Sequence, residues 1–455
     1  MKKKKNNFNY DLNLHNHAFI MIMTGSVFGR KFIMNENALI PKLSELKMNI
    51  RKDVLNCFLD GKSHDVNEIA AAVGVSRQTV MKSLSFFMKE DLLVATGKGE
   101  AGRAGGKKPL LYAFSSSLYL ICVTLWGTNF RINLYDMNGK LIDYLKLDMP
   151  VPETAAGAAD NIGRLALVLM QKNQIRLEDV RGVSVSVPGI VDRKLNTLVF
   201  SSPIPQWGFN VPLADYIRPY FAEGTLIYIE SPSKIHSAQF FHLERFVHRR
   251  VLVIALSKGL TGCLIENGHI LNGTHSLIGE IGHLIIDPND PQECNCGSRG
   301  CLTNMVSPER LKKIIREEKD RYPDSVLHDI DEKNELECYH AILSASEAGD
   351  ALARRCSDYL AAQFSIALHN ISLIFDPDYV VFVGDYFPGN EIFSRQIYER
   401  LSSFRYFPEG EKPFEILYDS CDLIERDAVS SMMTLRWRLL NRNELYLDNE
   451  EGLKE

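Results

Sequence analysis

The spacing of apolar residues divides the chain into regions of different structure. Short segments of helical period, followed by a Gly/Lys-rich turn, occupy residues 46–114. Apolar strands alternate with turns and one or two helices from residue 117 to about 305. Residues 307–437 are mostly of helical period, with one further strand in DYVVFVGD. These patterns predict a helical N-terminal domain followed by a larger α/β body.

Three helices are predicted at the start of the chain. Apolar residues recur at helical spacing in the first, at Ile50, Val54, Leu55, Phe58 and Leu59. Asp65, followed three residues later by Glu68, is the pattern of a capping box that opens the second helix. Gly74 marks a tight turn, and the third helix is predicted to begin at Ser76 and to bury Val80, Leu84 and Phe87. Two helices joined by a short Gly-containing turn form a helix-turn-helix arrangement.

The outward face of the third helix carries donors suited to DNA. Recognition helices reach base edges from their N-terminal end, which here holds Ser76, Arg77, Gln78, Thr79 and Lys82. The two strands that follow enclose a Gly/basic loop resembling a wing, with contacts to the DNA backbone predicted for Lys98, Arg103, Lys107 and Lys108. Residues 76–108 hold seven Lys/Arg and three Asp/Glu, a local charge of +4 in a chain of net charge −5. This contrast favours a DNA-binding domain over a small helical domain with solvated charges.

The composition and the N-terminal sequence argue against several other classes of protein. With 455 residues, 45 % of them hydrophobic, the chain can form two or three cores, and its net charge does not suit a general nucleic-acid binder. No apolar run reaches the roughly 18 residues that span a bilayer. Most cysteines are scattered singly, which fits a reducing cytoplasm. MKKKK and AFIMIMTGSVFG faintly resemble a signal peptide, but polar residues separate them, so residues 1–45 are predicted to be a leader, with Met34 as a possible start.

Three cysteines lie close together in ECNCGSRGCLT, residues 293–303. Cys294 and Cys296 are too close to form an unstrained disulfide, and a nucleophilic cysteine would need a base rather than two further thiols. Thiolates in a Gly-rich loop can converge on a tetrahedral zinc ion, and His283 lies eleven residues before Cys294. We therefore predict a closed, structural Zn²⁺ site of His283, Cys294, Cys296 and Cys301, with a loop of free thiols as the alternative.

The same segment carries a resemblance to a known family. GEIGH followed by CNCGSRGCL resembles the signature of the ROK family, named for repressors, open reading frames and kinases. VSVSVPGIVDRKLNTLVFSSPIPQWGFN is similar to the sugar-side strand and loop of that family, LSKGLTGCLIENGHILNGTHSLIGEIGH to its second phosphate loop, and FDPDYVVFVGD to a strand near the nucleotide. The resemblance covers about residues 46–437 and favours the repressor branch. It implies a two-lobed, actin-like ATPase fold that binds a sugar between its lobes.

The resemblance also implies that the kinase chemistry is missing. In kinases of the family an Asn-Asp pair follows a strand, and the Asp takes the proton from the sugar hydroxyl. This chain has Ser231 and Pro232 there, and Glu230 is expected to point to the opposite face of the strand. The three phosphate loops also depart from the family pattern, with Trp126 inside residues 124–128, two glycines replaced inside residues 259–263, and Asp385 after Gly384. We therefore predict a chain that is not an enzyme.

Part of the family's sugar site is retained. Glu280 and His283 match family residues that touch the sugar, whereas Thr303 stands where a further sugar-binding Glu is expected. Trp207 is predicted to stack on or line the ligand, with a packed hinge aromatic as the alternative. Glu280 has the alternative role of ordering His283. The predicted effector site, for a sugar or sugar derivative, is Trp207, Glu280 and His283.

Together these features predict a cytoplasmic transcriptional regulator. We expect a repressor of carbohydrate uptake or metabolism genes, such as those for xylose, that binds a double-stranded DNA operator as a homo-oligomer, either dimer or tetramer. The alternatives are an ATP-dependent sugar kinase with a fused DNA-binding head, and a regulator controlled by a protein partner. The predicted segments are a leader (1–45), a winged helix-turn-helix domain (46–114), an N-terminal lobe (117–235), a C-terminal lobe with the zinc loop (236–437) and an acidic tail expected to fray (438–455).

Overall fold

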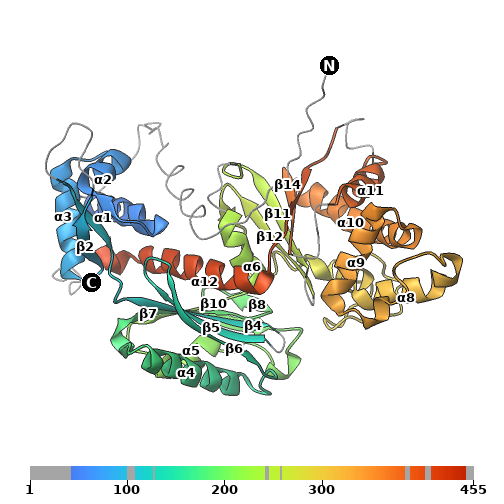
Figure 1. Ribbon diagram of the computed structural model, residues 1–455, viewed down its shortest axis with the longest axis horizontal. Coiled ribbons are helices and arrows are strands. Elements are labelled where there is room, and N and C mark those ends of the chain that lie inside the picture. Colours follow the sequence, from blue (N-terminus) through green and yellow to red (C-terminus); the bar gives the residue numbers. More distant parts are fainter. Residues whose placement is uncertain are drawn as a thin grey trace. The chain divides into compact units, whose positions relative to one another are not determined.

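The chain folds into two compact units (Figure 1). The computed structural model describes residues 43–99, 108–126, 129–240, 245–256, 259–384, 390–404 and 411–446. Among these described residues, those up to 116 form the N-terminal unit together with residues 440–446, and those from 117 to 439 form the body. Most of the predicted leader, up to residue 42, lies outside the described residues, as does the predicted tail from residue 447.

The N-terminal unit combines helices with a small antiparallel sheet. Its helices are α1 (Leu43–Asn56), α2 (Val66–Val73) and α3 (Arg77–Lys89), with a 3-10 turn, η1 (Cys57–Asp60), after the first. The sheet places β3 (Leu110–Phe114) between β1 (His64–Asp65) and β2 (Leu93–Lys98). Two strands joined by a loop thus follow α3 directly.

Local hydrogen bonds and a left-handed glycine define where α2 and α3 begin and where α2 ends. The Asp65 carboxylate accepts from the backbone N–H of Glu68 at 3.0 Å, and the Glu68 carboxylate accepts from the backbone N–H of Asp65 at 3.0 Å, which confirms the predicted capping box. Gly74 ends α2 in the left-handed region, at φ 73°. The Ser76 hydroxyl accepts from Thr79 N–H at 3.2 Å and caps α3, as predicted. The inward residues of α3, Val80, Leu84 and Phe87, are fully buried.

His64 gives this unit a pH-dependent contact. Its Nε2 lies 2.9 Å from Asp60 Oδ1, and this hydrogen bond raises the pKa of the imidazole, with further support from the charges of Asp60 and Glu68. Asp60 is buried, so the ionised pair is partly shielded from solvent.

Protonated His64 should therefore stabilise the N-terminal unit. The contribution is complete below the unfolded pKa, about 6.5, and is lost as pH rises through the raised folded pKa. Replacing His64 with Gln should lower hydrogen-exchange protection of α2 and α3 more at pH 6 than at pH 8.5, by on the order of 1 kcal/mol. An equal loss at both pH values would show that the charge of His64 is irrelevant. His328→Gln, on the body, serves as the control.

A segment from the far end of the chain completes the N-terminal unit. The predicted acidic tail starts at residue 438, but the last helix continues to Leu440, and residues Asn443–Tyr446 fold as a 3-10 turn, η9. Tyr446 is only 2 % exposed, and its ring meets that of Phe87 edge-on with centroids 6.1 Å apart. Arg51 donates from Nη1 to the Tyr446 carbonyl at 2.7 Å. The first part of the predicted tail is therefore folded rather than frayed.

The first lobe of the body is built on a five-stranded sheet. Its order is β10-β7-β4-β5-β6, with strands β4 (Tyr119–Trp126), β5 (Asn129–Asp136), β6 (Leu141–Asp148), β7 (Val180–Ser186) and β10 (Leu226–Glu230). β4 runs antiparallel to β5 and parallel to β7. Helices α4 (Ala155–Lys172) and α5 (Leu213–Ile217) cover one face of this sheet (Figure 1). The hairpin of β8 (Ile190–Asp192) and β9 (Thr197–Phe200) lies between β7 and α5 in the chain.

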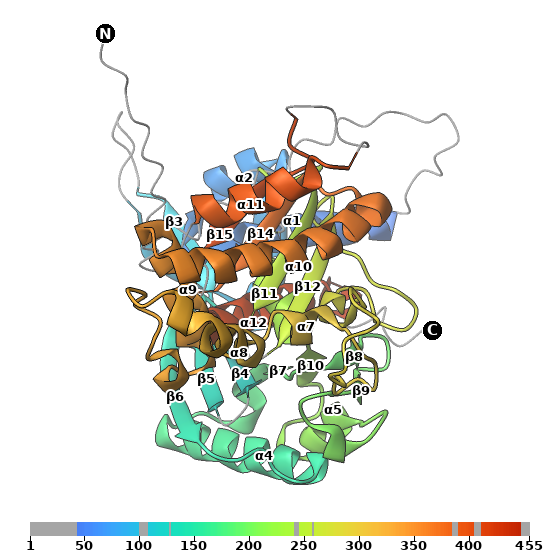
Figure 2. The same ribbon diagram turned by 90° about the vertical axis from the view of Figure 1, so that its right-hand side faces the viewer.

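The second lobe repeats this topology. Its sheet has the order β13-β12-β11-β14-β15, with strands β11 (Arg250–Leu256), β12 (Leu260–Glu266), β13 (His269–Ile270), β14 (Tyr379–Val383) and β15 (Glu415–Asp419). When the strands of each sheet are numbered in chain order within their lobe, both sheets have the strand order 3-2-1-4-5. Figure 2 shows α9 (Glu335–Ala348), α10 (Ala351–Phe375) and α11 (Glu391–Leu401) in front of the second sheet. The sequence shows no matching repeat, because the two lobes share strand order rather than residues.

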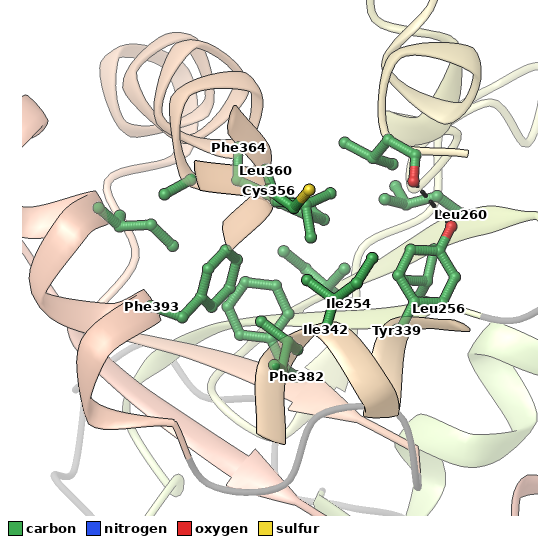
Figure 3. Packing of buried hydrophobic residues seen from close by; sticks show 14 of the residues in the cluster. Ile254, Leu256, Leu260, Tyr339, Ile342, Cys356, Leu360, Phe364, Phe382 and Phe393 are labelled. Carbon is green, nitrogen blue, oxygen red and sulfur yellow. Dashed lines mark hydrogen bonds between the residues drawn. The ribbon is translucent and has the colours of Figure 1, made fainter. Parts of the chain in front are cut away.

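The core of the second lobe lies between this sheet and its helices. Aromatic rings of Phe364, Phe382 and Phe393 meet edge-on there, at centroid distances of 5.4–5.9 Å (Figure 3). Tyr339 on α9 is buried and donates its hydroxyl hydrogen to the Val306 carbonyl at 2.7 Å. This bond fixes α9 to the loop that precedes α8 (Pro308–Glu318).

The last helix, α12 (Leu423–Leu440), returns to the first lobe. Arg436 donates to the Met137 carbonyl at 3.1 Å, the Arg438 guanidinium lies 3.9 Å from the ring centre of Tyr228, and Leu435 packs on Gly182. The expected C-terminal lobe, residues 236–437, therefore contributes a helix that covers the sheet of the other lobe (Figure 1).

Candidate ligand cavity and metal centre

A cavity of about 460 Å³ lies in the body where the two lobes meet. The first lobe contributes Trp126 from the end of β4 and Ser231 after β10. Pro232 and His236 come from α6 (Pro232–Ser237), which packs on β11 and β12 of the second lobe. The second lobe contributes Gly259 and Thr261 around β12, Glu280 and His283, and Thr303 from α7 (Leu302–Met305). Most of the positions that the family resemblance selects thus come together in one place.

Close backbone contacts hold the GEIGH segment on β12. Gly262 N–H donates to the Gly279 carbonyl at 2.7 Å. A Cβ on Gly279 would lie 2.3 Å from the Gly262 carbonyl oxygen, and one on Gly282 would lie 2.0 Å from that of Leu260. Only glycine permits this approach, which places Glu280 and the short helix η6 (Ile281–His283) at the cavity wall.

The four predicted metal ligands converge. One ligand atom from each of His283, Cys294, Cys296 and Cys301 lies within 4.8 Å of all the others. Cys294 Sγ is 3.6 Å from His283 Nδ1, and Cys296 Sγ is 3.6 Å from Cys301 Sγ. A tetrahedral site with metal–sulfur bonds of 2.3 Å has ligand–ligand edges of about 3.8 Å. The cluster therefore has the size and donor set to hold one metal ion.

The backbone around the cluster is shaped for this convergence. Cys294 N–H donates to the Ser298 carbonyl at 2.8 Å, and Gly297 turns the loop at φ 86°. Gly300 is also left-handed, at φ 69°, and a Cβ there would lie 1.7 Å from the Asp287 carbonyl oxygen. The hydrogen bond and the two left-handed glycines together define the path of the loop around the cluster.

Electrostatics in the cluster favour a bound cation. Burial lowers the pKa of His283, which keeps the imidazole neutral and able to coordinate. Burial raises the pKa of the Cys294 and Cys301 thiols. Burial also acts against ionisation of Cys296, but hydrogen bonds from Ser298 and the neighbouring thiols lower its pKa. A bound cation would stabilise the thiolate forms of all three.

Glu280 has an unusual environment for a carboxylate at the cavity wall. Burial raises its pKa, and the charge of Lys234 opposes that shift. Lys234 on α6 is itself buried. The charge of Lys234 thus acts on a carboxyl group that lines the cavity.

The position of the kinase base holds no acid–base group. Pro232 lines the cavity. The Glu230 carboxylate points elsewhere: it pairs with Arg193, accepts from Tyr228 Oη at 2.8 Å and accepts from Ser231 N–H at 3.0 Å. With these partners Glu230 is fully buried and is not among the described residues lining the cavity.

The phosphate-loop positions are only partly described. Trp126 lines the cavity, and Thr124 is buried and donates its hydroxyl hydrogen to Asp427 Oδ2 at 2.6 Å. Gly127, Thr128 and Asp385 lie outside the described residues. In the second loop, Gly259, Leu260 and Thr261 all line the cavity.

Trp207 does not join this set. Its ring is 8 % exposed, packs in the core of the first lobe and donates from Nε1 to the Pro152 carbonyl at 2.8 Å. It is not among the described residues that line the cavity. The arrangement matches the alternative of a packed aromatic.

The predicted DNA contacts separate into several groups. Arg77, Gln78 and Lys82 are exposed on α3, whereas Ser76 and the half-buried Thr79 bond to each other at 2.9 Å and serve the helix start. Lys98 and Lys108 are exposed at the same end of the β2–β3 hairpin. Arg103 and Lys107 lie outside the described residues.

Two buried polar residues at the cavity were not found from the sequence. His236 lines the cavity, and its Nε2 lies 3.1 Å from Oδ1 of the fully buried Asp427 on α12. Neither belongs to a motif, and α12 is remote in the chain. The one signal in the sequence is that Asp427 is an acidic residue in a helical segment of mixed apolar and polar pattern.

The fold and the cavity define a class: a two-lobed, actin-like protein of the sugar-kinase type. The ROK family matches residues 120–420, so the chain belongs to the ROK family, and the predicted membership is confirmed. The predicted two-lobed kinase-type fold of the body is confirmed as well, whereas the winged helix-turn-helix domain and the zinc site stay predictions. The helices that the structure describes include none long and apolar enough to cross a membrane.

Relatives include both kinases and repressors. A glucokinase of Thermotoga maritima is 26 % identical over 287 residues, which is 63 % of this chain and 88 % of the relative. A xylose repressor of Bacillus spizizenii is 24 % identical over 358 residues, 78 % of this chain and 86 % of the relative. The crystal structure of a ROK family transcriptional regulator, a homolog of the E. coli MLC protein, shares the fold with a TM-score of 0.69 at 16 % identity, over 88 % of this chain and 98 % of that one.

Proposed function

We propose that this protein is a DNA-binding transcriptional repressor of carbohydrate genes, with a kinase-like body that binds a sugar effector and does not transfer phosphate. The N-terminal unit acts as a winged helix-turn-helix domain. The body provides oligomerisation and the response to the ligand. A two-fold dimer would bind half-sites one helical turn or more apart, roughly 34 Å.

The arrangement of α3 carries this proposal. The helix follows α2 after a turn at Gly74, buries Val80 and Leu84 on one side, and exposes Arg77, Gln78 and Lys82 at its N-terminal end on the other. That is the position from which a recognition helix contacts base edges. The exposed Lys98 and Lys108 on the following hairpin suit contacts to phosphates.

The similarity to repressors supports the same function. The match to the xylose repressor spans 358 residues, against 287 for the glucokinase, so it extends over more of this chain. In its narrower form, the proposal is that the repressed genes are those of xylose metabolism.

Changes on α3 should separate base contacts from structural effects. An operator is first selected from random duplex DNA, and binding is measured by gel shift at several salt concentrations. Arg77→Ala and Gln78→Ala should each weaken specific binding by 10- to 100-fold, about 1–3 kcal/mol. Lys98→Ala should weaken binding to all sequences and reduce the salt slope by about 1.

Lys89→Ala is the matched control, because Lys89 is exposed at the other end of α3. Its effect on specific binding should stay below about threefold. If the wild-type protein selects no sequence at any salt concentration, the proposed function is wrong.

We also propose that the metal is a structural zinc ion. Three thiolates and one imidazole are the soft and borderline donors that zinc prefers, and four protein ligands leave no open position for a reactive water. His283, Cys294, Cys296 and Cys301 would hold the ion, whose role is to fix the loop beside Glu280.

The absence of kinase activity is proposed from the surroundings of Pro232. Proline offers no proton acceptor, and the nearby Glu230 is occupied by Arg193 and Tyr228. Incubation with ATP and a panel of sugars should yield no sugar phosphate. Turnover that is lost on replacing Glu230 with Gln would favour the fused sugar kinase instead.

A further inference from the structure

The exposed face of α3 is not uniformly polar. Met81 lies on this face with 42 % of its surface exposed, and Arg77 and Ser85, also exposed, lie four residues before and after it. Residues four apart are neighbours on one side of a helix, so the three form one row along α3. The buried residues of α3 lie on its other side, and Met81 is not one of them.

Met81 belongs to the end of α3 from which base edges are read. Long side chains on a helix lean toward its N-terminus and cover the turn that precedes their own Cα atom. Met81 is therefore expected to cover the turn that carries Arg77 and Gln78, the two proposed base contacts. Met88, which is equally exposed at 41 %, is seven residues further on, about 10 Å toward the C-terminal end of the helix. The two methionines thus differ in their distance from the proposed bases and not in their exposure.

The charges around Met81 suit a polyanion. Residues 77–89 contain Arg77, Lys82 and Lys89 and no Asp or Glu, and residues 76–108 as a whole carry a charge of +4. A basic surface of this kind attracts DNA phosphates. The partner that would cover the face around Met81 is therefore a DNA duplex.

The major groove of DNA offers one apolar group to such a side chain. Every base pair presents hydrogen-bond donors or acceptors there, and thymine alone adds a C5-methyl group. Methionine has no N–H or O–H, and its sulfur is only a weak acceptor, so it cannot read the polar base edges well. Its thioether can instead remove the thymine methyl group from water, a contact that changes an equilibrium constant about fourfold.

We propose that Met81 contacts the C5-methyl group of a thymine and so selects a T·A base pair in each half-site of the operator. The inference rests on the proposed function, because it takes α3 as the recognition helix. Arg77 and Met81 are about 6 Å apart along the helix axis, and successive base pairs are about 3.4 Å apart. The thymine should therefore lie within about two base pairs of the one that Arg77 contacts.

Replacing thymine with deoxyuridine in the selected operator tests this contact. Deoxyuridine pairs as thymine does and lacks only the methyl group. Each thymine of a half-site is replaced in turn, and binding of the full-length protein is measured by gel shift. At one thymine the change should weaken binding of the wild type about fourfold and binding of Met81→Ala by less than about 1.5-fold. The base pair at which Arg77→Ala loses specificity should lie within two positions of that thymine.

Three further variants separate this contact from a general effect on α3. Met81→Leu keeps an apolar side chain of similar size and should keep the response to deoxyuridine, whereas Met81→Gln, which is of similar length but polar, should lose it. Met88→Ala is the matched control, because Met88 is as exposed as Met81 on the same helix. It should bind the operator and respond to deoxyuridine as the wild type does.

The inference can fail while the proposed function stands. If the wild type selects an operator whose half-sites contain no fixed thymine, or if Met81→Ala and the wild type respond alike to deoxyuridine at every thymine, Met81 does not read a base. If the wild type selects no sequence at all, the proposed DNA-binding function is wrong and the role of Met81 is wrong with it.

Discussion

Replacing Cys301 with serine is expected to release the metal and to destabilise the body by on the order of 5 kcal/mol. Cys301 is fully buried, and it lies at the first position of the turn into α7, where its backbone bridges to Ile285. A serine hydroxyl is a poor zinc ligand, so His283 and two thiols would remain around an incomplete site. Elemental analysis should fall from about one zinc per chain to near none, and thermal unfolding should occur at a lower temperature.

Cys356→Ser is the matched control for this prediction. Cys356 is equally buried on α10 but is not part of the cluster. Its serine variant should lose about 1–3 kcal/mol through a buried hydroxyl and keep its zinc. A chelator should lower the unfolding temperature of the wild type and of Cys356→Ser, and leave that of Cys301→Ser almost unchanged. Full zinc content in Cys301→Ser would refute the proposed ligand set.

The metal cluster shows what the sequence can predict. Three of its ligands lie within eight residues and the fourth is eleven residues away, so donor type and spacing were sufficient to select them. The capping box of Asp65 and Glu68 is local in the same sense. Strand alternation also predicted that Glu230 would turn away from Ser231, and the structure places its carboxylate with Arg193.

The Asp427 cluster shows where prediction from the sequence stops. Thr124 and Asp427 meet although 303 positions separate them in the chain, because α12 returns to the first lobe. Nothing local to either residue indicates that approach. Trp207 illustrates a second limit: stacking on a sugar and packing in a core require the same apolar ring, and only the three-dimensional placement separates them.

Replacing Tyr446 with alanine is expected to destabilise the N-terminal unit by about 3–5 kcal/mol, the cost of removing a large buried aromatic side chain. The change empties a site against Phe87 and Leu440, since the Tyr446 hydroxyl donates to the Leu440 carbonyl. Phe87 belongs to the buried side of α3, so its loss of packing should reach the helix that carries Arg77 and Gln78. Hydrogen exchange in α3 should accelerate, and operator binding should fall in proportion to the unfolded fraction.

Tyr446→Phe distinguishes the ring from the hydroxyl. It keeps the contact with Phe87 and loses one buried hydrogen bond, so the expected cost is about 1 kcal/mol, with operator binding nearly preserved. Zinc content should be normal in both variants, because the metal cluster lies in the body. If Tyr446→Ala bound the operator as the wild type does and its α3 amides exchanged at the wild-type rate, residues 443–446 would not contribute to the stability of the N-terminal unit. If both effects appear, the stability of the N-terminal unit depends on residues 443–446, which follow the body in the chain.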